Sequence, residues 1–193
     1  MPRVKLFDEN EVLKKASELF WKKGYHATSI QDLVSSLGIN RGSLYDTYGG
    51  KKELFDKAFQ LYRKTNTNGV VAVLESQNDV KKGFRNLFEK EINQTISDKD
   101  KKGCFVVNTT TELIPGENEM LKILQENKRF FENAFYQFLL KGQQNGEISK
   151  NKNLKTISRL FYIFISGLQV VAKVETDPKK LMNSVDEILI LLD

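Results

Sequence analysis

The chain has 193 residues, 40% of them hydrophobic, which is enough apolar material for one large domain or for a small domain joined to a larger one. A single cysteine excludes an intramolecular disulfide framework, and a single histidine outside any Cys/His cluster leaves no zinc site of recognisable spacing, so we expect no metal and no cofactor. Most of the net charge of +5 lies in residues 1–64, with 12 Lys and Arg against 8 Asp and Glu, whereas residues 65–193 have 18 against 17.

Apolar residues recur with helical period along nearly the whole chain, and only three prolines interrupt it. This pattern predicts an all-α protein. The first helix is expected over residues 8–23. Asp8 and Glu11 form a plausible capping pair at its start, and Gly24 ends it.

Two short helices are predicted next. The first of them has Thr28 as N-cap and Gln31 at the capping-box position, and it ends at Gly38. Asn40 caps the following helix, which ends at Gly49. Isolated helices need roughly 12 to 15 residues to be stable in water, so contacts with the rest of the fold must hold this short helix.

A fourth helix is expected to begin at residue 50 or 51 and either to continue or to break around residues 65–69. We place a domain boundary here, with a helix-turn-helix domain at 1–50 and a larger helical domain, for ligand binding and dimerisation, at 51–193. Further helices are predicted at about 79–97, 103–113, 117–144, 153–175 and 178–192.

The pair of short helices has the pattern of a helix-turn-helix: a helix ending at glycine, a short turn, and a second helix with its own N-cap. The major groove of B-DNA admits one helix, and DNA binding would explain the short helix because it only has to cross one groove. The basic excess of this region agrees with DNA binding, although a solvated lysine-rich surface explains the charge alone equally well. The outward residues are hydrogen-bonding or very small: Asn40, Arg41, Gly42, Ser43, Tyr45 and Thr47.

The segment FWKKGYHATSIQDLVSSLGINRGSLYDTYGGKKELF, residues 20–55, resembles the DNA-binding domain of the TetR/AcrR family of transcriptional repressors, and the resemblance covers about residues 8–58. It implies a homodimer with a three-helix DNA-binding module and a larger, divergent domain that dimerises and often binds a small-molecule inducer. Double-stranded operator DNA is the implied partner. The identity of the inducer does not follow from the resemblance.

Residue by residue, the resemblance implies that Thr28 and Ser29, at the start of the second helix, and Lys51 meet DNA phosphates. The outward residues of the third helix would lie in or beside the groove. Asp46 departs from the family, in which many members have a histidine or another basic or aromatic residue. A carboxylate near phosphates is unfavourable, so Asp46 either faces away, pairs with Arg41 or a lysine, or accepts from a cytosine amine.

The larger domain is predicted to hold the ligand site. Its many phenylalanines could line a pocket, although phenylalanines at helical spacing are more often simply core. The predicted ligand-binding residues are Phe59, Tyr62, Cys104, Phe105, Asn108, Phe131 and Phe161.

Cys104 has two interpretations. It follows Lys101 and Lys102 at a predicted helix start, where both the helix N-terminus and the ammonium groups lower a thiol pKa and favour the reactive thiolate. A similar Gly-Cys segment recurs in a branch of the resembled family that includes repressors answering electrophiles or oxidants. The alternative is a small, buried apolar residue.

The last two predicted helices are apolar on two sides, so each must be covered on two sides. We expect one side to face its own domain and the other to pair with a second copy in a four-helix interface. In the helix at 153–175 one stripe comprises Ile157, Leu160 or Phe161, Phe164, Leu168 and Val171, and the other comprises Ile163, Val170 and Val174.

The N-terminal segment has no apolar run of signal-peptide length, and polar residues interrupt the most apolar segment, 160–174, so we expect a cytoplasmic protein without a membrane span. No catalytic residues are predicted, because Cys104 has no histidine nearby in sequence and no phosphate-binding glycine loop is present. The predicted function is a ligand- or thiol-responsive repressor that binds a palindromic operator as a dimer. The alternative is a helical adaptor that acts through protein partners.

Overall fold

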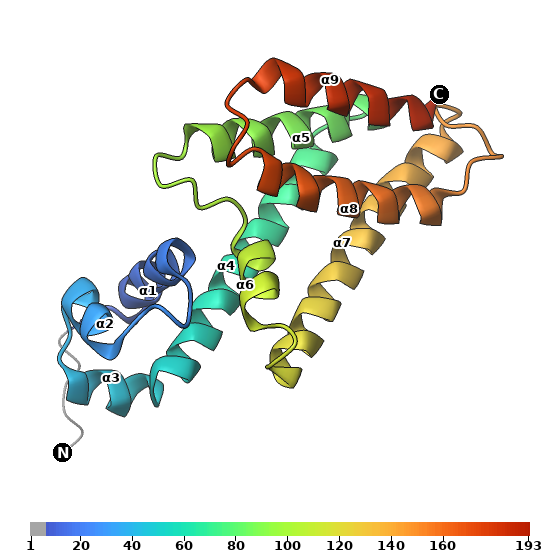
Figure 1. The fold of residues 1–193 in the computed structure, drawn as a ribbon. Coiled ribbons are helices and arrows are strands. Elements are labelled where there is room, and N and C mark those ends of the chain that lie inside the picture. The colour runs from blue at the N-terminus through green and yellow to red at the C-terminus, as the bar shows by residue number, and fades with distance from the viewer. Residues whose placement is uncertain (1–6) are drawn as a thin grey trace. The chain divides into compact units, whose positions relative to one another are not determined.

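The computed structural model describes residues 7–193, and all regular secondary structure within this range is helical, which confirms the all-α prediction (Figure 1). The elements are α1 (Glu9–Lys23), α2 (Ile30–Leu37), α3 (Arg41–Tyr48), α4 (Lys51–Glu75), α5 (Val80–Ser97), α6 (Phe105–Leu113), α7 (Asn118–Gln144), α8 (Leu154–Val171), α9 (Pro178–Leu189) and the 3₁₀ turn η1 (Ile190–Leu192).

The chain divides into two compact units, one ending at Thr65 and the other spanning Asn66–Asp193. The division falls inside α4, which runs without a break, rather than at residue 50. The reason is that the first turns of α4 bury Leu54 and Phe55 in the first unit. The predicted first domain also includes residues 1–6, which lie outside the described residues.

The start of α2 differs from the prediction by one residue. The N-cap is Ser29, whose hydroxyl accepts from the backbone N–H of Asp32 at 3.0 Å, while the Asp32 carboxylate accepts from the Ser29 N–H at 2.8 Å. Thr28 and Gln31 were therefore wrongly assigned as the capping pair. Thr28 is instead fully buried, and its hydroxyl donates to the Gly24 carbonyl at 2.6 Å.

An ion pair joins α1 to α2. Lys23 Nζ lies 2.6 Å from Asp32 Oδ2, the same carboxylate that completes the capping box. The hydrogen bonds from Lys23 and Ser29 hold the pKa of Asp32 well below its usual range. The capping carboxylate is therefore ionised at neutral pH.

Aromatic packing forms the core of the first unit. Phe20 meets Phe55 edge-on at 5.1 Å between ring centroids, and Phe55 stacks on Phe59 at 5.8 Å. The two short helices each contribute buried side chains, Leu33 and Leu37 from α2 and Leu44 and Tyr48 from α3. Tertiary contacts therefore stabilise helices that are too short to be stable alone.

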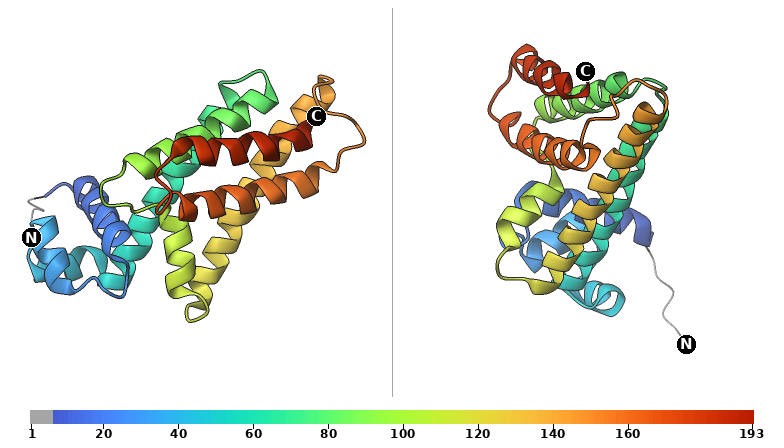
Figure 2. Two further views of the ribbon diagram at one scale, coloured as in Figure 1. Left: turned by 45° about the horizontal axis from the view of Figure 1, so that its top comes forward. Right: turned by 90° about the vertical axis from the view of Figure 1, so that its right-hand side faces the viewer.

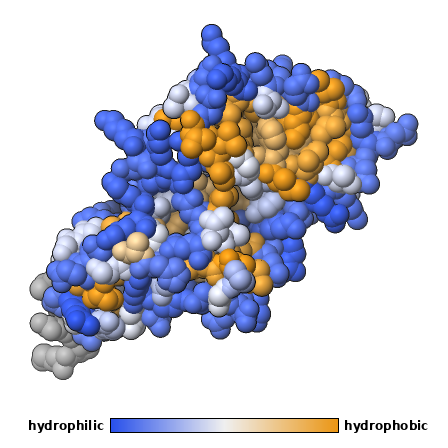
Figure 3. Space-filling view, in the orientation of Figure 1, coloured by the Kyte–Doolittle hydropathy of each residue, from blue (hydrophilic) through white to orange (hydrophobic). Residues whose placement is uncertain are grey.

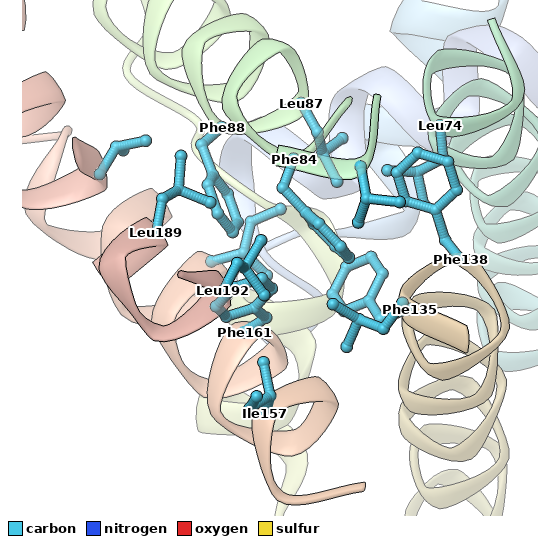
Figure 4. Packing of buried hydrophobic residues seen from close by; sticks show 14 of the residues in the cluster. Leu74, Phe84, Leu87, Phe88, Phe135, Phe138, Ile157, Phe161, Leu189 and Leu192 are labelled. Atoms are coloured by element: carbon cyan, nitrogen blue, oxygen red, sulfur yellow. The ribbon is translucent and has the colours of Figure 1, made fainter. Parts of the chain in front are cut away.

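The second unit has its own core, built from α4, α5, α7, α8, α9 and η1. Figures 1 and 2 show α5 lying beside α9, with α8 alongside α7. Phe84 occupies the centre (Figure 4), with ring centroids 5.4 Å from Phe135, 5.5 Å from Phe138 and 4.7 Å from Phe161. Phe161, a predicted ligand-binding residue, is thus fully buried among core aromatics.

Candidate nucleic-acid interface and internal cavity

The turn between α2 and α3 has the geometry of a helix-turn-helix. Gly38 ends α2 with φ +68°, a left-handed conformation that glycine adopts without strain. Ile39 is buried, and Asn40 Oδ1 accepts from the backbone N–H of Ser43 at 2.8 Å. Asn40 is therefore the N-cap of α3, as predicted.

One face of α3 is open to solvent. Arg41, Gly42, Tyr45 and Asp46 are exposed, and the Arg41 guanidinium lies 5.7 Å from the Tyr45 ring centroid. Ser43 and Thr47 are partly exposed. The predicted outward residues thus share one surface, and a cation–π contact holds its two largest side chains together.

Asp46 belongs to this open surface and does not face the core. Among residues 7–193 it forms no ion pair with Arg41 or with a lysine. The carboxylate of Asp46 is therefore not paired with a neighbouring cation among the described residues.

The start of α4 places a cation beside the loop that precedes α2. Lys51 Nζ lies 4.5 Å from the Tyr25 ring centroid and 3.5 Å from the His26 carbonyl oxygen. Lys51 and Ser29 both reach the surface. The side chain of Thr28 is buried, and its hydroxyl donates to the Gly24 carbonyl. The predicted contact of Thr28 with phosphate is therefore wrong, because the hydroxyl does not reach the surface.

The second unit has a small, partly open cavity of about 40 Å³. Two of the predicted ligand-binding residues, Cys104 and Phe131, line it. The lining residues are Asn66, Val70, Glu91, Cys104, Val106, Val107, Asn127, Phe131, Phe135, Tyr162, Ile165, Ser166 and Gln169. A separate pocket of about 230 Å³ lies between α4 and α7, lined by residues such as Val71 and Phe130.

The other predicted ligand-binding residues lie elsewhere. Phe59 and Tyr62 belong to the first unit, where Tyr62 meets the Trp21 ring at 5.0 Å. Phe105 is buried, and Asn108 is held by hydrogen bonds, donating to the Lys102 carbonyl at 2.8 Å. The seven residues therefore do not form one site.

Glu91 and Asn127 are functional candidates that the sequence analysis missed. Both are buried polar residues at core-facing positions, Glu91 in register with Phe84 and Phe88 on α5. A polar side chain within an apolar helical stripe is a signal readable from sequence, because buried polar groups carry a desolvation cost.

The electrostatics of the cavity centre on Glu91. Its Oε2 accepts from Gln169 Nε2 at 2.5 Å. Burial raises the pKa of Glu91, and the bond from Gln169 and the nearby Lys90 partly oppose this shift. Burial also raises the pKa of Tyr162.

Cys104 is the N-cap residue of α6 and is buried, with 6% of its surface exposed. The Lys102 ammonium, one of the two predicted to activate the thiol, lies 3.3 Å from Asp98 Oδ1 in a largely buried ion pair. The side chain of Cys104 lines the cavity.

The outer face of α8 is apolar. Ile163 is 63% exposed, Val170 50% and Val174, just past the helix end, 80%. Figure 3 shows hydrophobic patches on the surface of the molecule. By length and composition alone α8 also resembles a membrane span, but its other face is buried in the core. Phe164 packs against Phe88 at 5.3 Å, so it belongs to the covered stripe.

Each of the two units matches a family of known proteins. Residues 12–58 match the family model described as bacterial regulatory proteins, tetR family, and residues 82–187 match tetracyclin repressor-like, C-terminal domain. The uncharacterized HTH-type transcriptional regulator YezE of Bacillus subtilis is 36% identical over 194 residues, with 100% of both chains covered. The HTH-type transcriptional repressor ComR of Escherichia coli is 28% identical over 182 residues, covering 94% of this chain and 87% of ComR.

Solved structures share the fold. A cysteine mutant of the TetR family regulator CifR, complexed with 26 bp double-strand operator DNA, has a TM-score of 0.88 at 22% identity and covers 99% of this chain and 100% of its own. The reduced form of Escherichia coli NemR has a TM-score of 0.82 at 15% identity, covering 92% of this chain and 94% of NemR.

Proposed function

Because the chain belongs to the TetR family of bacterial regulatory proteins and is a DNA-binding transcriptional regulator, we propose that it represses transcription from a palindromic operator in the cytoplasm. The observation that carries this proposal is the solvent-facing surface of α3, where Arg41 and Tyr45 lie together above a capped helix start. Arginine is the side chain that most often reads guanine in the major groove. The name of ComR, a repressor, supports repression rather than activation.

A homodimer is the second part of the proposal. The exposed stripe of Ile163, Val170 and Val174 on one protomer would pack against the same stripe of a second copy, since a two-fold interface uses the same patch twice. Two α3 helices related by two-fold symmetry then require an operator with two half-sites separated by about one helical turn or more.

An inducer is the third part. We place its site in the cavity of the second unit, to which α4 contributes Asn66 and Val70. The same helix begins at Lys51, the residue proposed to bind phosphate. A ligand that favours a different position of α4 would change the spacing of the two α3 helices, and this is how we expect it to weaken DNA binding.

A thiol response is a variant of this mechanism. An adduct on Cys104 would occupy the same cavity as an inducer. Full modification by an electrophile, verified by mass, that leaves operator affinity unchanged would eliminate Cys104 as a switch and leave the noncovalent ligand.

Footprinting on the DNA that flanks the gene, followed by anisotropy titration of the protected fragment, tests the proposal. We expect saturable binding that weakens steeply with salt, because each neutralised phosphate releases a counterion. A helical adaptor would bind operator and random DNA equally weakly or not at all, and this result would favour the alternative function.

A further inference from the structure

The cavity of the second unit carries an acidic side chain, and its described lining contains no lysine, arginine or histidine. Glu91 is buried, with 9% of its surface exposed. Its hydrogen-bond partner across the cavity is a neutral amide, Gln169. A buried carboxylate is ordinarily paired with a cation, because the desolvation of a lone charge is costly. No lining side chain supplies that cation, and Lys90, the neighbouring residue on α5 whose charge acts on Glu91, does not line the cavity.

Three of the thirteen residues that line the cavity are aromatic. Phe131 and Phe135 line the cavity from α7 and Tyr162 lines it from α8, with the Phe131 and Tyr162 rings stacked at 6.3 Å. The faces of aromatic rings attract cations through the ring quadrupole. The acid and the rings therefore favour the same class of ligand.

We infer that the inducer is a small organic cation with a flat aromatic body, and that Glu91 is the residue that selects it. This inference rests on the proposed function, in which an inducer binds in this cavity. A cationic ligand stabilises the ionised carboxylate of Glu91, which burial disfavours, whereas a neutral ligand adds no opposite charge and an anionic ligand is repelled by the ionised form.

The cavity is too small for the ligand unless the protein changes conformation. At about 40 Å³ the cavity is far below the roughly 300–1,000 Å³ of typical ligand sites. An aromatic cation can enter only if the surrounding side chains or helices move. Binding therefore favours a second conformation, which is what an inducer requires.

Three probes of nearly equal shape test the charge preference on the full chain without DNA: benzamidine, benzamide and benzoate, which are cationic, neutral and anionic at pH 7. Isothermal titration calorimetry should give benzamidine an affinity at least about tenfold above that of benzamide, the gain typical of a charge-assisted hydrogen bond. Benzoate should bind most weakly.

Three variants assign the preference to one residue. Glu91→Gln keeps the shape of the side chain and should reduce the benzamidine preference to within about threefold. Glu126→Gln removes the same charge from the exposed surface of α7 and should leave the preference intact. Glu91→Asp retains the carboxylate and should keep the preference even where overall affinity falls.

Equal binding of the three probes, no binding of benzamidine at millimolar concentration, or a preference that survives in Glu91→Gln would each overturn the inference. None of these results touches the DNA-binding role, because the assay contains no DNA. Failure of the unmodified protein to bind operator would instead count against the proposed function.

Discussion

The Lys51 ammonium lies 4.5 Å from the centre of the Tyr25 ring, so the first residue of α4 is anchored to the loop before α2. The contact restricts the long lysine side chain near the start of a helix, where the backbone N–H groups also attract anions. A lysine held in this way can meet a phosphate at a low cost in side-chain entropy.

Lys51→Ala should therefore weaken binding to operator and random DNA about equally and reduce the slope of log affinity against log salt by about 1. Fluorescence anisotropy at several salt concentrations measures both quantities. Lys64→Ala, at the exposed end of the same unit, removes an equal charge and serves as the control. A loss confined to the operator would contradict the phosphate role.

Replacing Arg41 or Tyr45 by Ala should lower the discrimination between operator and random DNA, by about 1–3 kcal/mol for each lost base contact. The two side chains are in contact, so the double variant should lose less than the sum of the single losses. Competition titrations against random DNA give the ratio. If both variants bound all sequences equally weakly, these residues would be phosphate contacts instead.

Ile163→Asp should convert the protein from a dimer to a folded monomer, because it puts a charge into the apolar stripe of α8 that a second copy would bury. Phe164→Asp, one residue on, should unfold the protein, since Phe164 packs against Phe88. Light scattering combined with circular dichroism separates the two outcomes. A monomeric unmodified chain at micromolar concentration would refute the dimer and the palindromic operator together.

Gly83→Ala should destabilise the protein, because overpacking costs about 1–3 kcal/mol. The better helix propensity of alanine offsets up to about 1 kcal/mol of this cost. A Cβ at this position would lie 2.5 Å from Phe138 Cε1, in the centre of the core. Gly69→Ala on α4 is the control, because the nearest atom to its Cβ, Lys90 Nζ, would be 3.9 Å away, and it should gain stability. Urea unfolding gives both values.

The stability of the ligand-free protein should fall as pH rises from about 4.5 through the raised pKa of Glu91. In this range the unfolded chain has lost the proton that folded Glu91 retains, so deprotonation favours unfolding. Glu91→Gln should remove this decline and be the more stable form at pH 8, by on the order of 1 kcal/mol. Tyr162, Cys104 and Lys90 are the other titratable groups near Glu91.

Unfolding curves for both proteins at pH 5 and pH 8 measure the difference. Parallel behaviour of the two proteins across this range would show that Glu91 gains a counterion in the folded protein.

Local signals in the sequence were enough for the helices and for the surface of α3. Helical period, N-caps such as Asn40 and the terminal Gly38 are properties of neighbouring residues, and α3 was located by them. One local error, Thr28 in place of Ser29, arose because both residues suit an N-cap and only the burial of Thr28 separates them.

Contacts between distant residues decided the rest. The covered stripe of α8 is the one that contains Phe164, because the ring of Phe88 packs against it. The cavity brings together Glu91 and Gln169, which are 78 positions apart in the chain. Helical period shows that a stripe is apolar but not which neighbour covers it. The sequence by itself therefore determined the helices and the solvent-facing surface of α3, whereas only the tertiary structure decided where the cavity lies and which acidic side chain lines it, because burial is set by the packing of whole helices.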